Sequence, residues 1–209
     1  MTRVCLVGDA DVTLHYELLS RETSREALST YDLRRPFENS LAVSTVSLGS
    51  AISLCNDLRW YIVRFVDDVL IQEPSVSETE WLSHNLAADL RSDTVQPAET
   101  GEYLKVYGLE DPSDRADSRT RPPGADRTAV ETTESSQEPR GATGDQRRAT
   151  TESSADDGTD GEKGSTTAQP PRLVEPLYVR RTDGEIPDYD LRDVSGTLVV
   201  RLTEEEYAP

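Results

Sequence analysis

The clearest periodic pattern in the chain lies in residues 47–72, where apolar residues recur at steps of three and four. They are Leu48, Ala51, Ile52, Cys55, Leu58, Ile62, Phe65, Val66 and Val69. This spacing places one apolar stripe along a helix, and Pro74 stops it, so the pattern predicts a long central helix. One alternative stays open, because residues 60–66 are rich in β-branched and aromatic side chains. It is a helix to Leu58 followed by a hairpin that turns at Asp67-Asp68.

Local signals predict two further helices. Residues 22–33 have opposite charges three positions apart and apolar residues on one face. Ser77 and Glu80 form the S-x-x-E pattern, in which each side chain bonds the other residue's backbone amide at the start of a helix. This capping box predicts a helix from Ser77 to about Arg91.

Strand patterns occur in four places, and each is a short run rich in β-branched and aromatic residues. The segments are 3–7, 103–109, 173–179 and 197–202. Asp183-Gly184 marks a turn before the last of them. These elements predict an α+β fold, with a small mixed or antiparallel sheet of about four strands packed against two to three helices.

The pattern stops in residues 111–171, where Val130 is the only large aliphatic residue and no aromatic residue occurs. Such a segment buries too little apolar surface to offset the entropy of ordering it, so we expect a disordered, acidic insert. Because loop closure costs only about 0.6 kcal/mol per doubling of length, the strands on either side can still form a hairpin. We therefore expect a single domain of residues 1–110 and 172–203, followed by a flexible tail, 204–209. A linker between two domains is the weaker alternative, because the residues after the insert are too few to hold a core.

The charge is strongly negative, with 40 acidic and 22 basic residues and a net charge of -18. Lys105 and Lys163 are the only lysines. Salt screens the self-repulsion of such a surface, so the composition favours a halophilic protein over an acidic protein of an ordinary cytosol. The same field repels nucleic acid. With no signal peptide and no apolar run long enough to span a bilayer, we expect a cytoplasmic protein without a membrane partner.

The usual reactive groups are scarce. His15 and His84 are the only histidines and neither belongs to a motif, so both are expected on the solvated surface. Cys5 and Cys55 lie in apolar runs, which predicts two buried free thiols. No phosphate-binding glycine pattern follows Gly8. The sequence therefore predicts no catalytic residue, no metal ion and no cofactor.

Carboxylates supply a first candidate site. Asp9 and Asp11 follow the first strand, where acids can hold a cation or activate a water. In so acidic a chain such pairs also arise by chance. We expect these two, and likewise Asp67-Asp68 and residues 204–206, to be solvated.

Trp60 supplies a second candidate. In projection along the long helix, Trp60 and Ile71 lie opposite the main apolar stripe, beside Arg64 and Asp68. Two interpretations stand: a central helix covered on two sides, which is favoured, and an aromatic interface contact supported by arginine.

The amino-acid sequences of several segments resemble those of a haloarchaeal family of unknown function, domain of unknown function 5804. The segments that carry the resemblance are 2–8, 16–22, 60–67, 73–77, 79–83 and 175–179. The resemblance implies a halophilic archaeal source and a soluble domain. It brings no activity, cofactor or catalytic residue.

Two hypotheses of function follow. The first is a non-enzymatic cytoplasmic module, a protein-interaction or regulatory domain that acts through protein contacts. The second is a small ligand-binding domain or enzyme that uses carboxylates and arginines, namely Asp9, Asp11, Arg59 and Arg64. A deep pocket that joins these four residues would favour the second, and a flat exposed face with Trp60 would favour the first.

Overall fold

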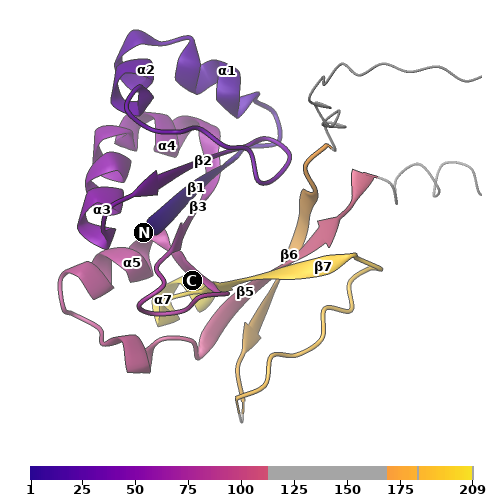
Figure 1. Cartoon of the computed structure of the whole chain (residues 1–209). Coiled ribbons are helices and arrows are strands. Elements are labelled where there is room, and N and C mark those ends of the chain that lie inside the picture. Colours follow the sequence, from indigo (N-terminus) through magenta and orange to yellow (C-terminus); the bar gives the residue numbers. More distant parts are fainter. Residues whose placement is uncertain (113–168, 183, 209) are drawn as a thin grey trace, which may run out of the picture. The chain divides into compact units, whose positions relative to one another are not determined.

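The structure of the protein is a computed structural model, which describes residues 1–112, 169–182 and 184–208. These residues form one seven-stranded sheet with helices packed against part of it (Figure 1). The strands are β1 (Thr2–Gly8), β2 (Ser40–Thr45), β3 (Val66–Gln72), β4 (Trp81–Ser83), β5 (Tyr103–Glu110), β6 (Arg172–Arg180) and β7 (Gly196–Arg201). The helices are α1 (Leu14–Leu19), α2 (Glu22–Leu28), α3 (Leu48–Asp57), α4 (Arg59–Phe65), α5 (His84–Arg91) and α7 (Glu204–Tyr207), with a 3-10 turn η1 at Pro97–Glu99.

The strand order is β2-β1-β3-β4-β7-β5-β6. Neighbouring strands are antiparallel, except for β4 and β7, which are parallel. This parallel pair joins the N-terminal strands to the C-terminal ones, and its register is short: Trp81 pairs with Val200 and Leu82 with Arg201. The α+β class is confirmed, but the sheet is larger than the predicted four strands, and six helices accompany it within the described residues.

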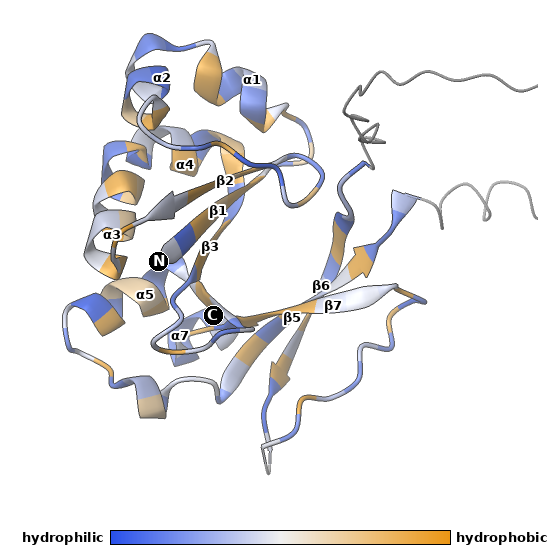
Figure 2. Cartoon of the chain, viewed as in Figure 1, coloured by the Kyte–Doolittle hydropathy of each residue, from blue (hydrophilic) through white to orange (hydrophobic). Residues whose placement is uncertain are grey.

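The sheet is buried on both faces at β1. Val4 and Leu6 point to one core with the helices, whereas Cys5 and Val7 point to a second core on the other face. Burial on both faces explains why the first strand has a continuous apolar run without alternation. Figure 2 shows hydrophobic residues concentrated in β1 to β3, and helices that mix hydrophobic and hydrophilic positions.

The second core joins the two halves of the sheet. Val7 and Leu70, from β1 and β3, share one buried cluster with Tyr107 and Val200, from β5 and β7. Asp68 of β3 also accepts hydrogen bonds from Lys105 and Tyr107 of β5, although β4 and β7 separate the two strands in the sheet, so the sheet curls to bring one face of both halves together.

The predicted long helix is right only in its first two thirds. α3 ends at Asp57, α4 continues from Arg59 to Phe65, and from Val66 the chain is the extended strand β3. The alternative hairpin at Asp67-Asp68 is also wrong, because both residues lie within β3. The apolar spacing did not reveal the switch from helix to strand at Val66. The β-branched residues of β3 pair with β1, and this tertiary pairing overrides the local helical pattern.

The predicted helix start at Ser77 is wrong. The Ser77 hydroxyl does accept a hydrogen bond from the Glu80 amide, at 3.0 Å, but the turn leads into the short strand β4. α5 begins six residues later, with the Ser83 hydroxyl accepting from the Leu86 amide at 3.2 Å. The end at Arg91 is confirmed.

Three smaller expectations also change. The helix predicted for residues 22–33 ends at Leu28, and the preceding helix α1 was not predicted. Residues 204–209 were expected to be a flexible tail, but they include the helical turn α7. The Glu206 carboxylate of α7 accepts hydrogen bonds from Ser83, the N-cap of α5, and from Asn85 within α5.

The strands on either side of the insert pair as predicted. β5 and β6 are antiparallel, with Leu109 opposite Leu173 and Glu110 opposite Arg172. The expectation of disorder between them concerns residues that lie outside the described part of the chain, as does Asp183 of the predicted turn. None of the helices described here combines the length and apolar character needed to cross a bilayer.

Candidate functional site

Trp60 lies on the outer face of α4. Leu58 separates α3 from α4, and from there the buried positions are Tyr61 and Phe65, one helical turn apart. This spacing turns the intervening positions outward. Trp60 is 55% exposed and Val63 is 80% exposed. The interpretation that the helix is covered on two sides is therefore wrong, because α4 buries only the face of Tyr61 and Phe65.

Aromatic and cationic contacts fix the indole ring of Trp60. Its edge-to-face neighbours are Tyr61 and Phe65, with ring centroids at 5.0 and 5.8 Å. The guanidinium groups of Arg21 and Arg64 lie 5.5 and 5.7 Å from the centroid of the indole, within the range of cation–π attraction. The ring is thus exposed and held in place at the same time.

We call Arg21, Arg59, Trp60, Val63 and Arg64 the Trp60 patch. Its α4 members line a wide, shallow depression of about 610 Å³ together with Asn56 and Asp57. Arg21 also pairs with Glu17, at 3.0 Å. In the described part of the chain, neither Arg59 nor Arg64 forms an ion pair.

The Asp9–Asp11 turn lies at a different place, at the end of β1. The Asp9 carboxylate accepts a hydrogen bond from the Asp11 amide at 3.0 Å, and both side chains are exposed, as predicted. The Asn39 side chain holds the turn: its amide donates to the backbone oxygens of Asp9 and Val12, and its oxygen accepts from the Leu14 amide. Asn39 has a φ of 52°, which asparagine tolerates better than most residues. Hydrogen bonds from Asn39 and from the Phe65 carbonyl, both distant in sequence, therefore fix the turn.

A polar groove of about 720 Å³ adjoins this turn. Its charged lining residues have both signs: Asp9, Glu38 and Asp67 face Arg35 and Arg172. His15 also lines it. Burial, followed by the charge of Arg35, lowers the pKa of His15 below its usual value, so the imidazole is neutral near pH 7. The mixed signs give the groove no clear preference for an anion or a cation.

Asp68 belongs to a third place, within the curled sheet. One carboxylate oxygen, Oδ2, accepts from Lys105 Nζ at 3.0 Å and from the Tyr107 hydroxyl at 2.8 Å. The Asp68 and Lys105 side chains are only 17% and 13% exposed. The prediction that Asp68 is a solvated residue beside Arg64 is therefore wrong, because a strand and not a helix carries it.

Protonation within this cluster is well defined. Burial acts to lower the pKa of Lys105, but the adjacent Asp68 carboxylate outweighs burial, so the pKa lies above its usual value. Burial, followed by the charge of Asp68, raises the pKa of Tyr107 far above its usual range. The lysine stays charged and the tyrosine stays neutral, and both act as donors to Asp68. The cluster connects β3 to β5 and is structural.

Sequence analysis missed a second buried ion cluster. Glu80 accepts from Arg181 through one carboxylate oxygen and from Arg201 Nε through the other, the latter at 2.5 Å. The three side chains are 13 to 19% exposed. Arg201 also donates to the Thr100 hydroxyl, at 2.8 Å. Each of these residues lies in a predicted element or beside one. Sequence analysis could not bring them together, because they are spread from residue 80 to residue 201.

The remaining reactive groups do not form a site. Both cysteines are buried free thiols, as predicted, and burial raises the pKa of each to about 12. The prediction of a solvated surface position is wrong for His84, whose Nε2 is buried without a hydrogen-bond partner in the described residues. Burial lowers the pKa of His84. The Glu206 carboxylate acts to raise this pKa and the charge of Arg59 acts to lower it further, and the net shift is downward. No group of three or more metal-ligating side chains occurs in the ranges described.

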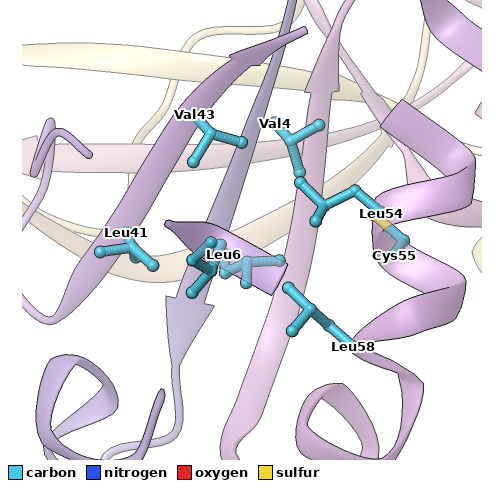
Figure 3. Close-up of a pocket in the computed structure, with 8 residues that line it drawn as sticks. Val4, Leu6, Leu41, Val43, Leu54, Cys55 and Leu58 are labelled. Atoms are coloured by element: carbon cyan, nitrogen blue, oxygen red, sulfur yellow. The ribbon is translucent and has the colours of Figure 1, made fainter. Parts of the chain in front are cut away.

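An internal cavity of about 10 Å³ lies in the first core (Figure 3). Side chains of β1, β2 and α3 converge on it, among them Val4, Leu41 and Leu54. The space is about that of one water and its lining is apolar, so it holds neither a ligand nor a bound water. It is a packing defect.

The structure thus divides the predicted site residues among three places. Asp9 lines the polar groove, and Arg59 and Arg64 line the shallow depression with Trp60. Asp11 is among the residues that line neither. Asp68 is engaged in its ion pair. The four residues of the enzyme hypothesis are not brought to one pocket.

A family model described as a family of unknown function (DUF5804) matches residues 2–109, from the start of β1 almost to the end of β5. No curated protein and no solved structure matches the chain significantly.

Proposed function

Because the chain belongs to this family, whose description assigns no activity, we propose from the geometry that it is a non-enzymatic protein-interaction or regulatory module that binds its partner at the Trp60 patch. One observation carries the proposal. Trp60 is 55% exposed, yet two arginines and two aromatic rings hold it in one orientation.

This combination is typical of the residues that dominate protein interfaces. Tryptophan and arginine are enriched among interface hot spots, and a side chain that is already ordered loses little entropy on binding. Val63, 80% exposed one helical turn away from Arg59, adds apolar area to the same face. The depression is shallow, which suits a protein surface better than a small molecule.

The enzyme hypothesis has less support from the geometry. A general acid or base must lie within hydrogen-bond reach of the group it serves. Asp9 and the two arginines of α4 line different cavities, so no single ligand in either cavity contacts all of them.

Affinity capture from a lysate of the source organism tests the proposal, with the wild type compared with Trp60→Ala. Tyr16→Ala is the matched control, because Tyr16 is an aromatic residue, 67% exposed, on α1 and outside the lining of the depression. A partner that binds the wild type and Tyr16→Ala should bind Trp60→Ala at least about 30-fold more weakly, which corresponds to roughly 2 kcal/mol.

Stability decides whether that loss is meaningful. Since half of the indole is already in solvent, Trp60→Ala should cost only about 1 kcal/mol of unfolding free energy. Equal binding by Trp60→Ala and wild type would refute the proposal. So would a partner lost only because the variant unfolds, which circular dichroism detects.

We also propose a cytoplasmic setting in a halophilic organism. A net charge of -18, with only two lysines in 209 residues, supports it, because salt screens the self-repulsion of such a surface. Thermal melts in rising KCl test this setting. Stabilisation into molar KCl is expected, whereas equal stability in low and molar salt would refute it.

A further inference from the structure

The charge of the Trp60 patch is opposite to that of the whole protein. The chain has 40 acidic and 22 basic residues, yet the patch brings together Arg21, Arg59 and Arg64. Two acids lie close by: Glu17 pairs with Arg21, and Asp57 lines the depression. The arginines of α4 thus keep guanidinium donors available on a protein with a large excess of carboxylates.

The order of side chains around α4 places apolar area between these donors. At 100° per residue, Val63 and Trp60 lie between Arg59 on one flank and Arg64 on the other. Arg64 also lies against the indole, 5.7 Å from its centroid. The exposed face of α4 is therefore an apolar centre with a guanidinium group on each side.

We infer that the Trp60 patch binds an acidic amphipathic segment of a partner protein, whose carboxylates pair with Arg59 and Arg64 and whose apolar side chain packs on Trp60 and Val63. This inference rests on the proposed function and names the chemistry of the partner. A helix with an apolar stripe flanked by Glu or Asp matches the face in both charge and order.

Other occupants fit the charges less well. A second copy of this chain, docked symmetrically by the same face, would place the arginines of one copy against those of the other. An anionic bilayer or a nucleic acid would attract the arginines, but an extended polyanion meets the field of the whole protein, with its net charge of -18. A short acidic segment can lie within the patch, where the local arginines dominate because salt screens charges beyond about 10 Å.

A synthetic helical peptide with a leucine stripe flanked by glutamates is a suitable probe. Its binding is followed by tryptophan fluorescence of the full chain, at the lowest KCl concentration that keeps the protein folded. Trp60 is 55% exposed and Trp81 is 7% exposed, so acrylamide quenching distinguishes the two tryptophans. Matched peptides carry glutamine or lysine in place of glutamate.

The glutamate peptide should shield Trp60 from acrylamide, and its Kd should rise at least about tenfold in 1 M KCl. The double variant Arg59→Gln/Arg64→Gln should weaken binding at least about tenfold, since it removes both charge-assisted contacts. Arg34→Gln is the control, because Arg34 is exposed and pairs with Asp32 away from the patch. It should bind as the wild type does.

Several results would overturn the inference: equal binding of the glutamine peptide, no salt-dependent binding of the glutamate peptide, or stronger binding of the wild type to phosphatidylserine vesicles than to the glutamate peptide. Failure of the proposed function is a separate result. A captured partner that depends on Trp60 but binds Arg59→Gln/Arg64→Gln normally would refute only the acidic chemistry. A partner indifferent to Trp60 would refute the module itself.

Discussion

Replacing Asp68 by alanine removes the acceptor that connects β3 to β5. One oxygen of its carboxylate accepts from the Lys105 ammonium at 3.0 Å and from the Tyr107 hydroxyl at 2.8 Å. After the change, a cation whose side chain is 13% exposed has no carboxylate, and a buried hydroxyl has no acceptor. We therefore expect a large loss of stability from this single substitution.

The magnitude follows from the burial of the pair. A hydrogen bond to a charged group contributes about 1.5–3 kcal/mol, and breaking a fully buried pair costs about 3–5 kcal/mol. The Lys105 ammonium can recover part of this through its remaining contact with water, so Asp68→Ala should lower the free energy of unfolding by about 2–3 kcal/mol. For a folded part of this size the melting temperature should fall by roughly 5–10 °C.

Urea unfolding monitored by circular dichroism measures the cost. Asp67→Ala is the matched control, because Asp67 is the adjacent but exposed carboxylate and should change stability by less than about 0.5 kcal/mol. A double-mutant cycle with Lys105→Met should give a coupling of about 1–2 kcal/mol. Equal costs for Asp67→Ala and Asp68→Ala, or a coupling near zero, would refute the assignment.

The pH dependence gives an independent check on the same pair. The pKa of Lys105 is raised above its usual value of 10.5, so the folded state binds this proton more tightly than the unfolded state does. The stability that the ion pair contributes is therefore fully present below pH 10.5 and is lost as the pH rises through the folded pKa. Lys105→Met should show no such loss.

Four shorter predictions concern other parts of the fold. Gly8→Ala should destabilise by about 1–3 kcal/mol in urea unfolding, because a Cβ there would lie 2.5 Å from the nearest side-chain nitrogen; a neutral result would contradict this packing. Cys5 and Cys55, whose pKa is raised to about 12 by burial, should resist a thiol reagent at pH 8 until the protein is unfolded, and rapid labelling of the native protein would show otherwise. Hydrogen bonds from neighbouring hydroxyl and amide groups outweigh burial and lower the pKa of Glu73 below 4.5, so its contribution is present above that pH and is lost as the pH falls. Acid unfolding of Glu73→Gln should lack this component. Replacing residues 113–168 by two glycines should leave the protein folded and stabilise it by up to about 2 kcal/mol, from several halvings of loop length; an unfolded product would contradict the single-domain prediction.

The parts of the fold that sequence predicted are those decided by local burial. β1 is apolar from Val4 to Val7, and β5 and β6 carry strand patterns up to the insert, so their existence and pairing could be predicted. Cys5 and Cys55 could be placed inside for the same reason. These elements contain their own signal.

The parts that failed are those decided by distant partners. Val66 and Val69 continue a helical spacing in the sequence, but as part of strand β3 they pair with β1 through a ladder of hydrogen bonds. Ser77 and Glu80 match the sequence pattern of a capping box, yet the Glu80 carboxylate binds two arginines that lie about a hundred residues later in the chain. Neither competition is visible in a local window.

The candidate site was predicted in part. Trp60 and its neighbouring arginines were chosen from a projection of the long helix. Residues 59–65 are helical in the structure, so the positions of these side chains around the helix axis are as projected. Asp68 was assigned to the same surface only because the helix was extended too far. Arg21 was missed, since it reaches Trp60 from the turn between α1 and α2 and no spacing rule relates the two.

The position of β7 in the sheet limits when the protein can finish folding. β5 contacts β4 only through β7, and β7 is residues 196–201. A chain that emerges from the ribosome can form β1 to β3 early, but β5 has no central neighbour until every residue from 111 to 195 has been synthesised. The sheet is therefore completed after translation has passed these residues, through contacts of long sequence separation that form slowly.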